Sequence, residues 1–193
     1  DKKGSRQKII GNVGVANEGS DNSIRESYMH LELDTKLIGS DLKELEKDIL
    51  AILDDVRLSV EDWRSMMGRA EEAIGSLREC PPPKDAEGAE ETCKFIDWLI
   101  DNNFTFLGYR EYRFEGNPLT ADFKAVRGSG LGLLRDPKRH ILRGAKGLTA
   151  ISPEIREFLS TPDPIIITKA NVKTRVHRPV HLDYIGIKLF DKK

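Results

Sequence analysis

The sequence lacks the marks of a secreted or membrane protein. Its two cysteines, Cys80 and Cys93, are too few for a disulfide framework and favour a reduced, cytoplasmic setting. The longest apolar run is the short block 165–167, whereas a helix needs about 20 apolar residues to cross a bilayer. No apolar leader stands at the start of the chain. We therefore expect a cytoplasmic protein that does not associate with a membrane.

The sequence also lacks an excess of charge of either sign. It has 31 lysines and arginines against 32 aspartates and glutamates, which gives a formal net charge of −1. Neither this balance nor any long basic run favours nucleic-acid binding. One basic cluster suits an acidic partner or, more simply, a solvated loop; its members are Arg135, Lys138, Arg139, Arg143 and Lys146.

Catalytic signatures are missing too. The glycine-rich stretch 128–132 has Leu133 where a dinucleotide fingerprint needs its third glycine, and it lacks the Gly-Lys-Ser/Thr of a P-loop. We interpret it as a turn or bulge. His177 and His181 are four residues apart, but Pro179 between them argues against a helix on which both would bind one metal ion. No catalytic, cofactor-binding or metal-binding residue is therefore assigned.

Both ends of the chain indicate a piece of a longer protein. The first residue is Asp1 rather than methionine, and the chain stops soon after the strand-like run 184–190. The function to be found is accordingly that of a segment. Any catalytic site of the longer protein can lie outside this segment.

Residues 7–35 predict a β-hairpin. The first strand is the Ile/Val-containing stretch 7–15, and the second alternates apolar and polar residues with Met29, Leu31 and Leu33 on one face. Two strands are rarely stable alone, so the hairpin must pack on the helix that follows or on sequence beyond this chain.

Residues 40–79 give the strongest helical signal. Apolar residues recur at steps of three and four, which predicts an amphipathic helix. Two interpretations stay open: one long helix with a stutter, or a bent pair whose second helix begins at Ser59. The apolar positions are Leu42, Leu45, Ile49, Ile52, Val56, Val60, Trp63, Met67, Ala70, Ile74 and Leu77.

The proline-rich stretch 80–88 ends this helix and predicts a linker between two domains. Beyond it the order of elements predicts an α+β fold with a mostly antiparallel sheet and flanking helices. The aromatic residues of the stretch 93–114 are expected mostly to fill its core. Helices are predicted at 87–102 and 153–160, and strands at 104–114, 123–128, 131–135, 165–170, 174–180 and 184–190.

Three blocks resemble one protein family. They are FIDWLIDNNFTFLGYREYRF at 95–114, GSGLGLLRDP at 128–137 and ITKANVKTRVHRPVHLDYIGIK at 167–188. They are similar to the N-terminal region of the very large bacterial NAD-specific glutamate dehydrogenases, and VEDWRSM at 60–66 fits the same family. The resemblance covers residues 38–193, while the first 37 residues match by layout more than by motif.

The resemblance implies a domain plan. Residues 1–79 would be the C-terminal part of an ACT-like domain, a β-β-α end, with the long amphipathic connecting helix. Residues 80–88 would be the linker, and residues 89–193 a PAS-like α+β domain. The dehydrogenase domain that binds NAD would lie well downstream, so this segment itself would hold no cofactor.

The resemblance also implies a role. The parent would convert L-glutamate and NAD to 2-oxoglutarate, ammonia and NADH, and this segment, inactive alone, would regulate or assemble it. Its partners would be other domains of the same polypeptide within a homo-oligomer. The alternative is an amino-acid sensor module that acts on a partner domain. Candidates for a ligand pocket are Tyr109, Arg110, His177 and Arg178; Lys169 is not assigned to a glutamate site.

Overall fold

The chain divides into two compact units, residues 1–39 and residues 40–193. In the first unit the strand predicted across Met29, Leu31 and Leu33 is wrong, because these side chains are exposed and the segment forms no strand. Alternation makes a strand only where a partner takes up its hydrogen bonds, and the predicted partner strand lies outside the described residues. The computed structural model describes residues 29–114, 123–139, 153–176 and 178–190.

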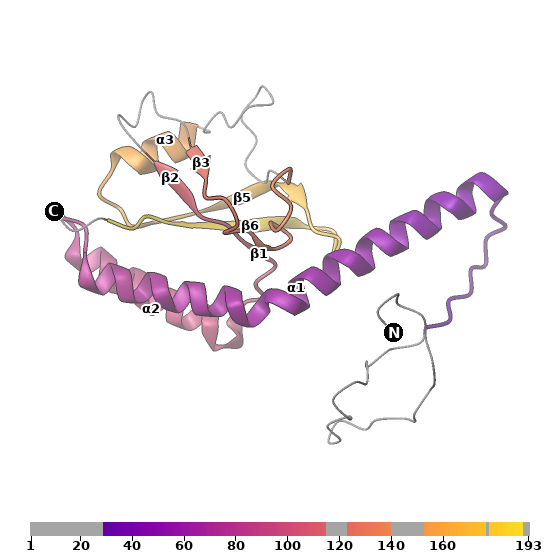
Figure 1. Cartoon of the computed structure of the whole chain (residues 1–193), viewed down its shortest axis with the longest axis horizontal. Coiled ribbons are helices and arrows are strands. Elements are labelled where there is room, and N and C mark those ends of the chain that lie inside the picture. The colour runs from indigo at the N-terminus through magenta and orange to yellow at the C-terminus, as the bar shows by residue number, and fades with distance from the viewer. Residues whose placement is uncertain (1–28, 115–122, 140–152, 177, 191–193) are drawn as a thin grey trace, which may run out of the picture. The chain divides into compact units, whose positions relative to one another are not determined.

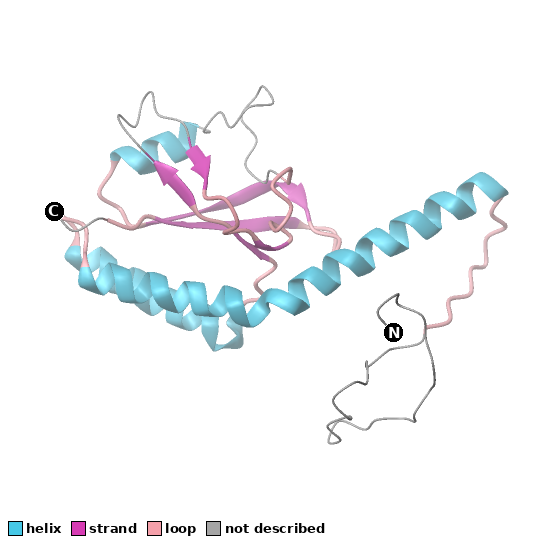
Figure 2. Cartoon of the chain, viewed as in Figure 1, coloured by secondary structure: helices cyan, strands magenta, loops and turns pink. Residues whose placement is uncertain are grey.

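Helix α1 runs unbroken from Gly39 to Glu79 (Figures 1 and 2), so the prediction of one long helix is confirmed over that of a bent pair. Ser59 begins no second helix. Its hydroxyl instead donates to the carbonyl of Asp55, one turn earlier, at 2.9 Å. The polar group is thereby satisfied within the helix and no break is needed.

The buried face of α1 differs from the predicted apolar stripe in the middle of the helix. Asp55, Ser59 and Asp62 are buried there, while the apolar residues beside them are exposed. Apolar periodicity marks the face that gains most from leaving water. In the middle of α1 the carboxylates of Asp55 and Asp62 are buried instead of the apolar face, because arginines from other elements pair with them. The exposed apolar residues are Val56, Val60 and Trp63.

Helix α2, Ala86–Trp98, packs against the second half of α1. The Asp85 carboxylate caps its start by accepting from the Gly88 N–H at 3.0 Å. The two helices share one core across the proline-rich stretch, in which Pro82 is buried. The core residues are Ala70, Ile74, Leu77, Cys93 and Ile96.

The predicted break after this helix is confirmed. A π-helical turn, Leu99–Asn103, contains Asn102 with a positive φ of 58°. The Asn103 side-chain amide donates to the carbonyl of Trp98 at 2.9 Å, which ties off the end of the helix. The aromatic residues beyond are less buried than expected: Phe106 packs on the core, but Trp98 and Phe104 are exposed.

The described strands all pair antiparallel, so the α+β prediction is confirmed. The strand predicted at 174–180 is wrong in its described residues: Thr174 makes a turn by donating its hydroxyl to the Val176 carbonyl, and Pro179 has no N–H to offer a sheet. The pairs are β1 (Gly108–Tyr109) with β4 (Leu131–Gly132), β2 (Tyr112–Phe114) with β3 (Phe123–Ala125), and β5 (Ile165–Lys173) with β6 (His181–Ile187).

The β5–β6 pair lies between helices on its two faces (Figure 1). Ile187 packs on the core that α1 and α2 form. The next residue, Lys188, faces the other way and donates to the carbonyls of Phe158 and Thr161 at the end of α3, Pro153–Ser160. Cations stabilise helix C-termini, so this lysine fastens α3 to the sheet.

We predict that Leu77→Ala lowers the free energy of unfolding by about 2–5 kcal/mol, because it leaves a cavity in the helical core. Leu77 is fully buried, whereas Leu50 on the same helix is 55% exposed. The matched control Leu50→Ala should change stability by less than about 0.5 kcal/mol. Urea unfolding measures both, and equal losses would contradict the packing described.

Candidate functional site

The buried charge of the described residues is concentrated in the middle of α1. Asp55, Ser59 and Asp62 follow one another at steps of four and three, so they share one face of the helix. A buried carboxylate without a partner is strongly destabilising. Each of the two aspartates is accordingly paired with arginines from outside the helix.

Asp62 is bound by Arg135 in a two-pronged arrangement. The Arg135 Nη2 and Nε atoms lie 2.6 Å and 3.1 Å from the two carboxylate oxygens, and the Gly132 N–H donates to Oδ2 at 2.7 Å. The hydrogen bonds from Arg135 hold the pKa of Asp62 below its usual value, with the Gly132 N–H adding to them and burial opposing them. Arg135 also pairs with Glu61 at 3.1 Å.

Asp55 binds two arginines that are far apart in the sequence. Arg139 Nη2 lies 2.5 Å from Oδ1, and Arg175 Nη2 lies 3.3 Å from Oδ2. One carboxylate thus joins α1 to the loop after β4 and to the turn after β5. Arg135 lies in an exposed loop, as predicted, and Arg139 at the end of that loop is partly buried. These pairs also hold both side chains against α1.

The glycine-rich stretch forms turns, as predicted. Gly128 and Gly132 have positive φ values of 79° and 56°. A Cβ on Gly132 would lie 2.4 Å from the carbonyl oxygen of Leu107, so only glycine fits. The N–H of the same glycine donates to the Asp62 carboxylate.

Arg110, a predicted pocket residue, is used to hold the same loop. Its guanidinium donates to the carbonyls of Leu134, Asp136 and Arg139 at 2.7, 2.7 and 2.9 Å. Three of its five N–H groups are thereby occupied within the chain. Its neighbour Tyr109 points to the other side of the strand.

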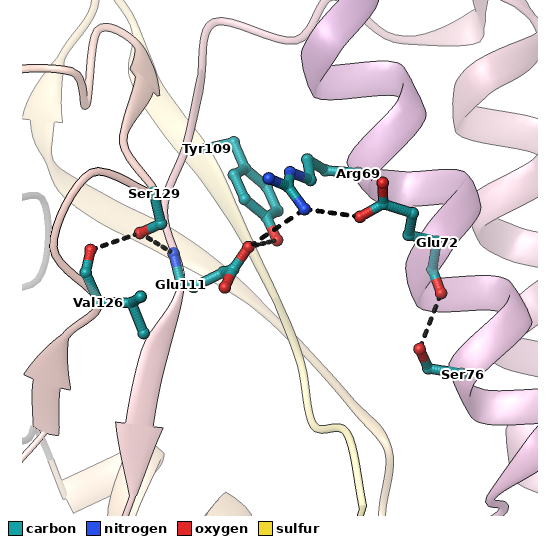
Figure 3. Close-up of polar contacts among 7 residues, drawn as sticks. All are labelled: Arg69, Glu72, Ser76, Tyr109, Glu111, Val126 and Ser129. Atoms are coloured by element: carbon teal, nitrogen blue, oxygen red, sulfur yellow. Dashed lines mark hydrogen bonds and ion pairs between the residues drawn. The ribbon is translucent and has the colours of Figure 1, made fainter.

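Tyr109, the other strand candidate, lies in a polar cluster between β1 and α1 (Figure 3). Its hydroxyl donates to Glu111 Oε1 at 3.0 Å. Arg69 of α1 lies 3.8 Å from that same oxygen and 2.7 Å from Glu72 Oε2. Ser129 fixes the backbone beside it by accepting from the Glu111 N–H at 3.1 Å. We call Arg69, Glu72, Tyr109 and Glu111 the Tyr109 cluster.

The chemistry of the Tyr109 cluster suits binding rather than proton abstraction. Burial, and then the neighbouring Glu111 carboxylate, raise the pKa of Tyr109, so the phenol stays protonated at neutral pH. Arg69 and Glu111 are 45% and 38% exposed and remain accessible to a solute. The cluster therefore presents a guanidinium and two carboxylates, the groups that bind the carboxylate and the ammonium of a zwitterion.

The remaining predicted residues do not join this cluster. His177 lies outside the described residues. Arg178 is exposed, and its backbone turns between Val176 and Val180. His181 makes a hydrogen bond to the carbonyl of Ala170 at 2.9 Å. Within the described part of the chain no three His, Cys, Asp or Glu side chains gather to hold a metal ion.

Neither the Asp55 and Asp62 pairs nor Arg69 and Glu111 were singled out from the sequence. The spacing of Asp55, Ser59 and Asp62 was a usable signal for a polar helical face, but their arginine partners lie 73 or more residues away along the chain. Lys169 forms an exposed ion pair with Asp183 across β5 and β6. In the described part of the structure, no helix is both long and apolar enough to span a membrane.

Comparison with curated proteins finds relatives of one kind. The NAD-specific glutamate dehydrogenase of Pseudomonas aeruginosa is 34% identical over 99% of this chain and 11% of its own length. That of Halomonas elongata is 32% identical over 86% of the chain and 10% of its own length. The chain thus spans about a tenth of the length of these relatives. No family model and no solved structure matches it.

Acid should weaken the Asp62 contribution to stability. An unfolded aspartate has a pKa of about 4, and the folded value lies below it. The contribution is therefore present above about pH 4 and is lost as pH falls through the folded pKa. We expect Asp62→Asn to cost about 1–3 kcal/mol at pH 7 and much less at pH 2.5, in urea titrations. The exposed Asp54→Asn should show no such pH-dependent difference, and a cost for Asp62→Asn that is equal at both pH values would contradict the pairing.

Proposed function

Because the chain belongs, as one segment, to the family of the NAD-specific glutamate dehydrogenases, we propose that it is a non-catalytic regulatory and oligomerisation segment of such an enzyme. The observation that carries the proposal is the extent of the match: nearly all of this chain aligns with only 11% of a relative. Most of the relative's length thus lies outside the segment and has room for the dehydrogenase chemistry.

The use of charge in the described residues supports this proposal. The buried carboxylates Asp55 and Asp62 are taken up by arginines that fasten loops to α1. The phenol of Tyr109 is held protonated, and Arg110 is bound to three carbonyls. These side chains hold helices and strands together. A segment that regulates an enzyme or joins its subunits requires such a firmly held structure.

The proposal extends to the setting of the segment. Residues 1–79 would be the end of an ACT-like domain with its connecting helix, and residues 89–193 a PAS-like domain. NAD would bind to a downstream domain of the parent, in the cytoplasm. The partners would be the other domains of that polypeptide and, through it, further copies in a homo-oligomer.

The isolated chain should not oxidise glutamate. With L-glutamate and NAD we expect no NADH absorbance above a blank, since in this proposal the hydride-transfer site lies elsewhere in the parent. The Pseudomonas aeruginosa relative serves as the positive control. A chimera of that relative in which this chain replaces the matching tenth should turn over, and its oligomeric state should match that of the relative. Sustained turnover by the isolated chain would contradict the proposal.

The Tyr109 cluster favours one second candidate function, an amino-acid sensor. Arg69 would bind the α-carboxylate of the ligand, and Glu72 and Glu111 its ammonium group. The half-exposed position of Arg69 and Glu111 at the boundary of α1 and β1 supports this role. Because the cluster joins a helix to a strand, a bound ligand would alter how the two are held together.

A thermal-shift titration with single amino acids tests the sensor. A ligand at about 100 times its Kd adds about 2.7 kcal/mol to the free energy of unfolding, so the melting temperature should rise. Arg69→Gln should abolish the rise. The matched control Arg57→Gln, an exposed arginine of the same helix that pairs with Asp54, should retain it. The sensor is excluded if no amino acid raises the melting temperature or if Arg69→Gln leaves the rise intact.

A further inference from the structure

The first half of α1 carries an apolar seam that the described residues leave exposed at its two ends and only partly buried between them. Its residues follow at steps of three, four, three and four, which is the a/d pattern of a helix that pairs with another helix. Leu42 is 52% exposed and Val56 36%. We call this set the open seam: Leu42, Leu45, Ile49, Ile52 and Val56.

The open seam continues an interface that already exists. In the same seven-residue register, Met66, Ala70, Ala73 and Leu77 are buried at the a and d positions of the second half of α1. There the covering helix is α2, which runs antiparallel because Cys93 contacts the Ile74 carbonyl while Glu90 pairs with Arg78.

The geometry of the pair explains why α2 stops short of the open seam. Trp98, the last residue of α2, is five residues beyond Cys93 and therefore lies about level with Arg69, five residues before Ile74. Beyond that point the chain turns away through the π-helical turn into β1. Helix α2 therefore does not cover the seam from Leu42 to Val56.

The charges beside the open seam select the kind of helix. The positions that flank the first part of the seam carry Asp41, Glu46 and Asp48, which are acidic and exposed, while Lys43 and Lys47 fall on the opposite side of the helix. The positions that flank its second part carry Leu53 and Asp55, and Asp55 is already paired with arginines. Pairing with a second copy in parallel would set Asp41 against Glu46, and an antiparallel copy would set aspartate against aspartate. Like charges at these positions disfavour self-pairing, whereas basic residues on a partner would form ion pairs.

We propose that the open seam docks an amphipathic helix whose apolar stripe is bordered by lysine or arginine. This partner would extend the helical pairing that α2 begins. The proposal does not depend on the function proposed above, because it rests only on the seam, its register and its flanking charges.

Two designed peptides test the partner chemistry against the full chain. Each has three heptads with leucine at a and d; one carries lysine at the flanking e and g positions and the other glutamate. By fluorescence anisotropy at low salt we expect the lysine peptide to bind at least about tenfold more tightly, and added salt to weaken it. Replacing both Glu46 and Asp48 by lysine should reverse the preference.

Two variants locate the binding. Ile49→Asp, in the seam, should weaken the lysine peptide about tenfold or more. Leu50→Asp, an equally drastic change at an exposed position off the seam, should leave binding within about twofold, with circular dichroism confirming that both variants keep their helix. Equal binding of the two peptides, binding of neither, or equal effects of the two variants would overturn the proposal. So would sedimentation showing a dimer of the chain that Ile49→Asp dissociates, since a second copy would then be the occupant.

Discussion

The pairing of Asp55 and Asp62 with three arginines is the constraint on which the rest of the described structure depends. The free-energy cost of removing a carboxylate from water is offset only when a well-placed cation and further hydrogen bonds replace the lost hydration. Arg135 and the Gly132 N–H do this for Asp62, and Arg139 and Arg175 do it for Asp55. Because these donors sit on the loop after β4 and the turn after β5, burying two side chains of one helix fixes both segments against it.

Other features follow from that attachment. β4 can approach the start of β1 this closely only because Gly132 has no side chain to meet the Leu107 carbonyl. Arg110 then holds the carbonyls of the same loop from the strand side. With β4 fixed, its partner β1 is fixed, and so is the place where Tyr109 and Glu111 meet Arg69. The candidate ligand site is in this sense a product of the buried ion pairs.

The sequence allowed the elements to be predicted better than their contacts. Helix α2 and its apolar face, α3 beginning at Pro153, and the antiparallel strands agree with local pattern, because periodicity and capping are local signals. The middle of α1 was mispredicted, since apolar periodicity favoured Val56 and Val60 over Asp55 and Ser59. Only the distant arginines make the polar face the buried one, and a single sequence does not reveal such pairs.

The mispredicted stripe has a physical meaning of its own. Of the apolar residues at a/d spacing from Leu42 to Val56, the two at the ends are exposed and the three between them are partly buried. Exposed apolar surface is costly, yet beside Val56 the domain turns Asp55 and Ser59 inward. Since α1 spans 41 residues, about 60 Å, without a break, its two halves are one rigid element. Whatever binds the open seam therefore acts on the helix that also carries Asp55, Asp62 and Arg69. The ion pairs fix the position of α1 against the loop after β4 and the turn after β5. The open seam and the Tyr109 cluster are therefore linked physically, because both lie on this one helix.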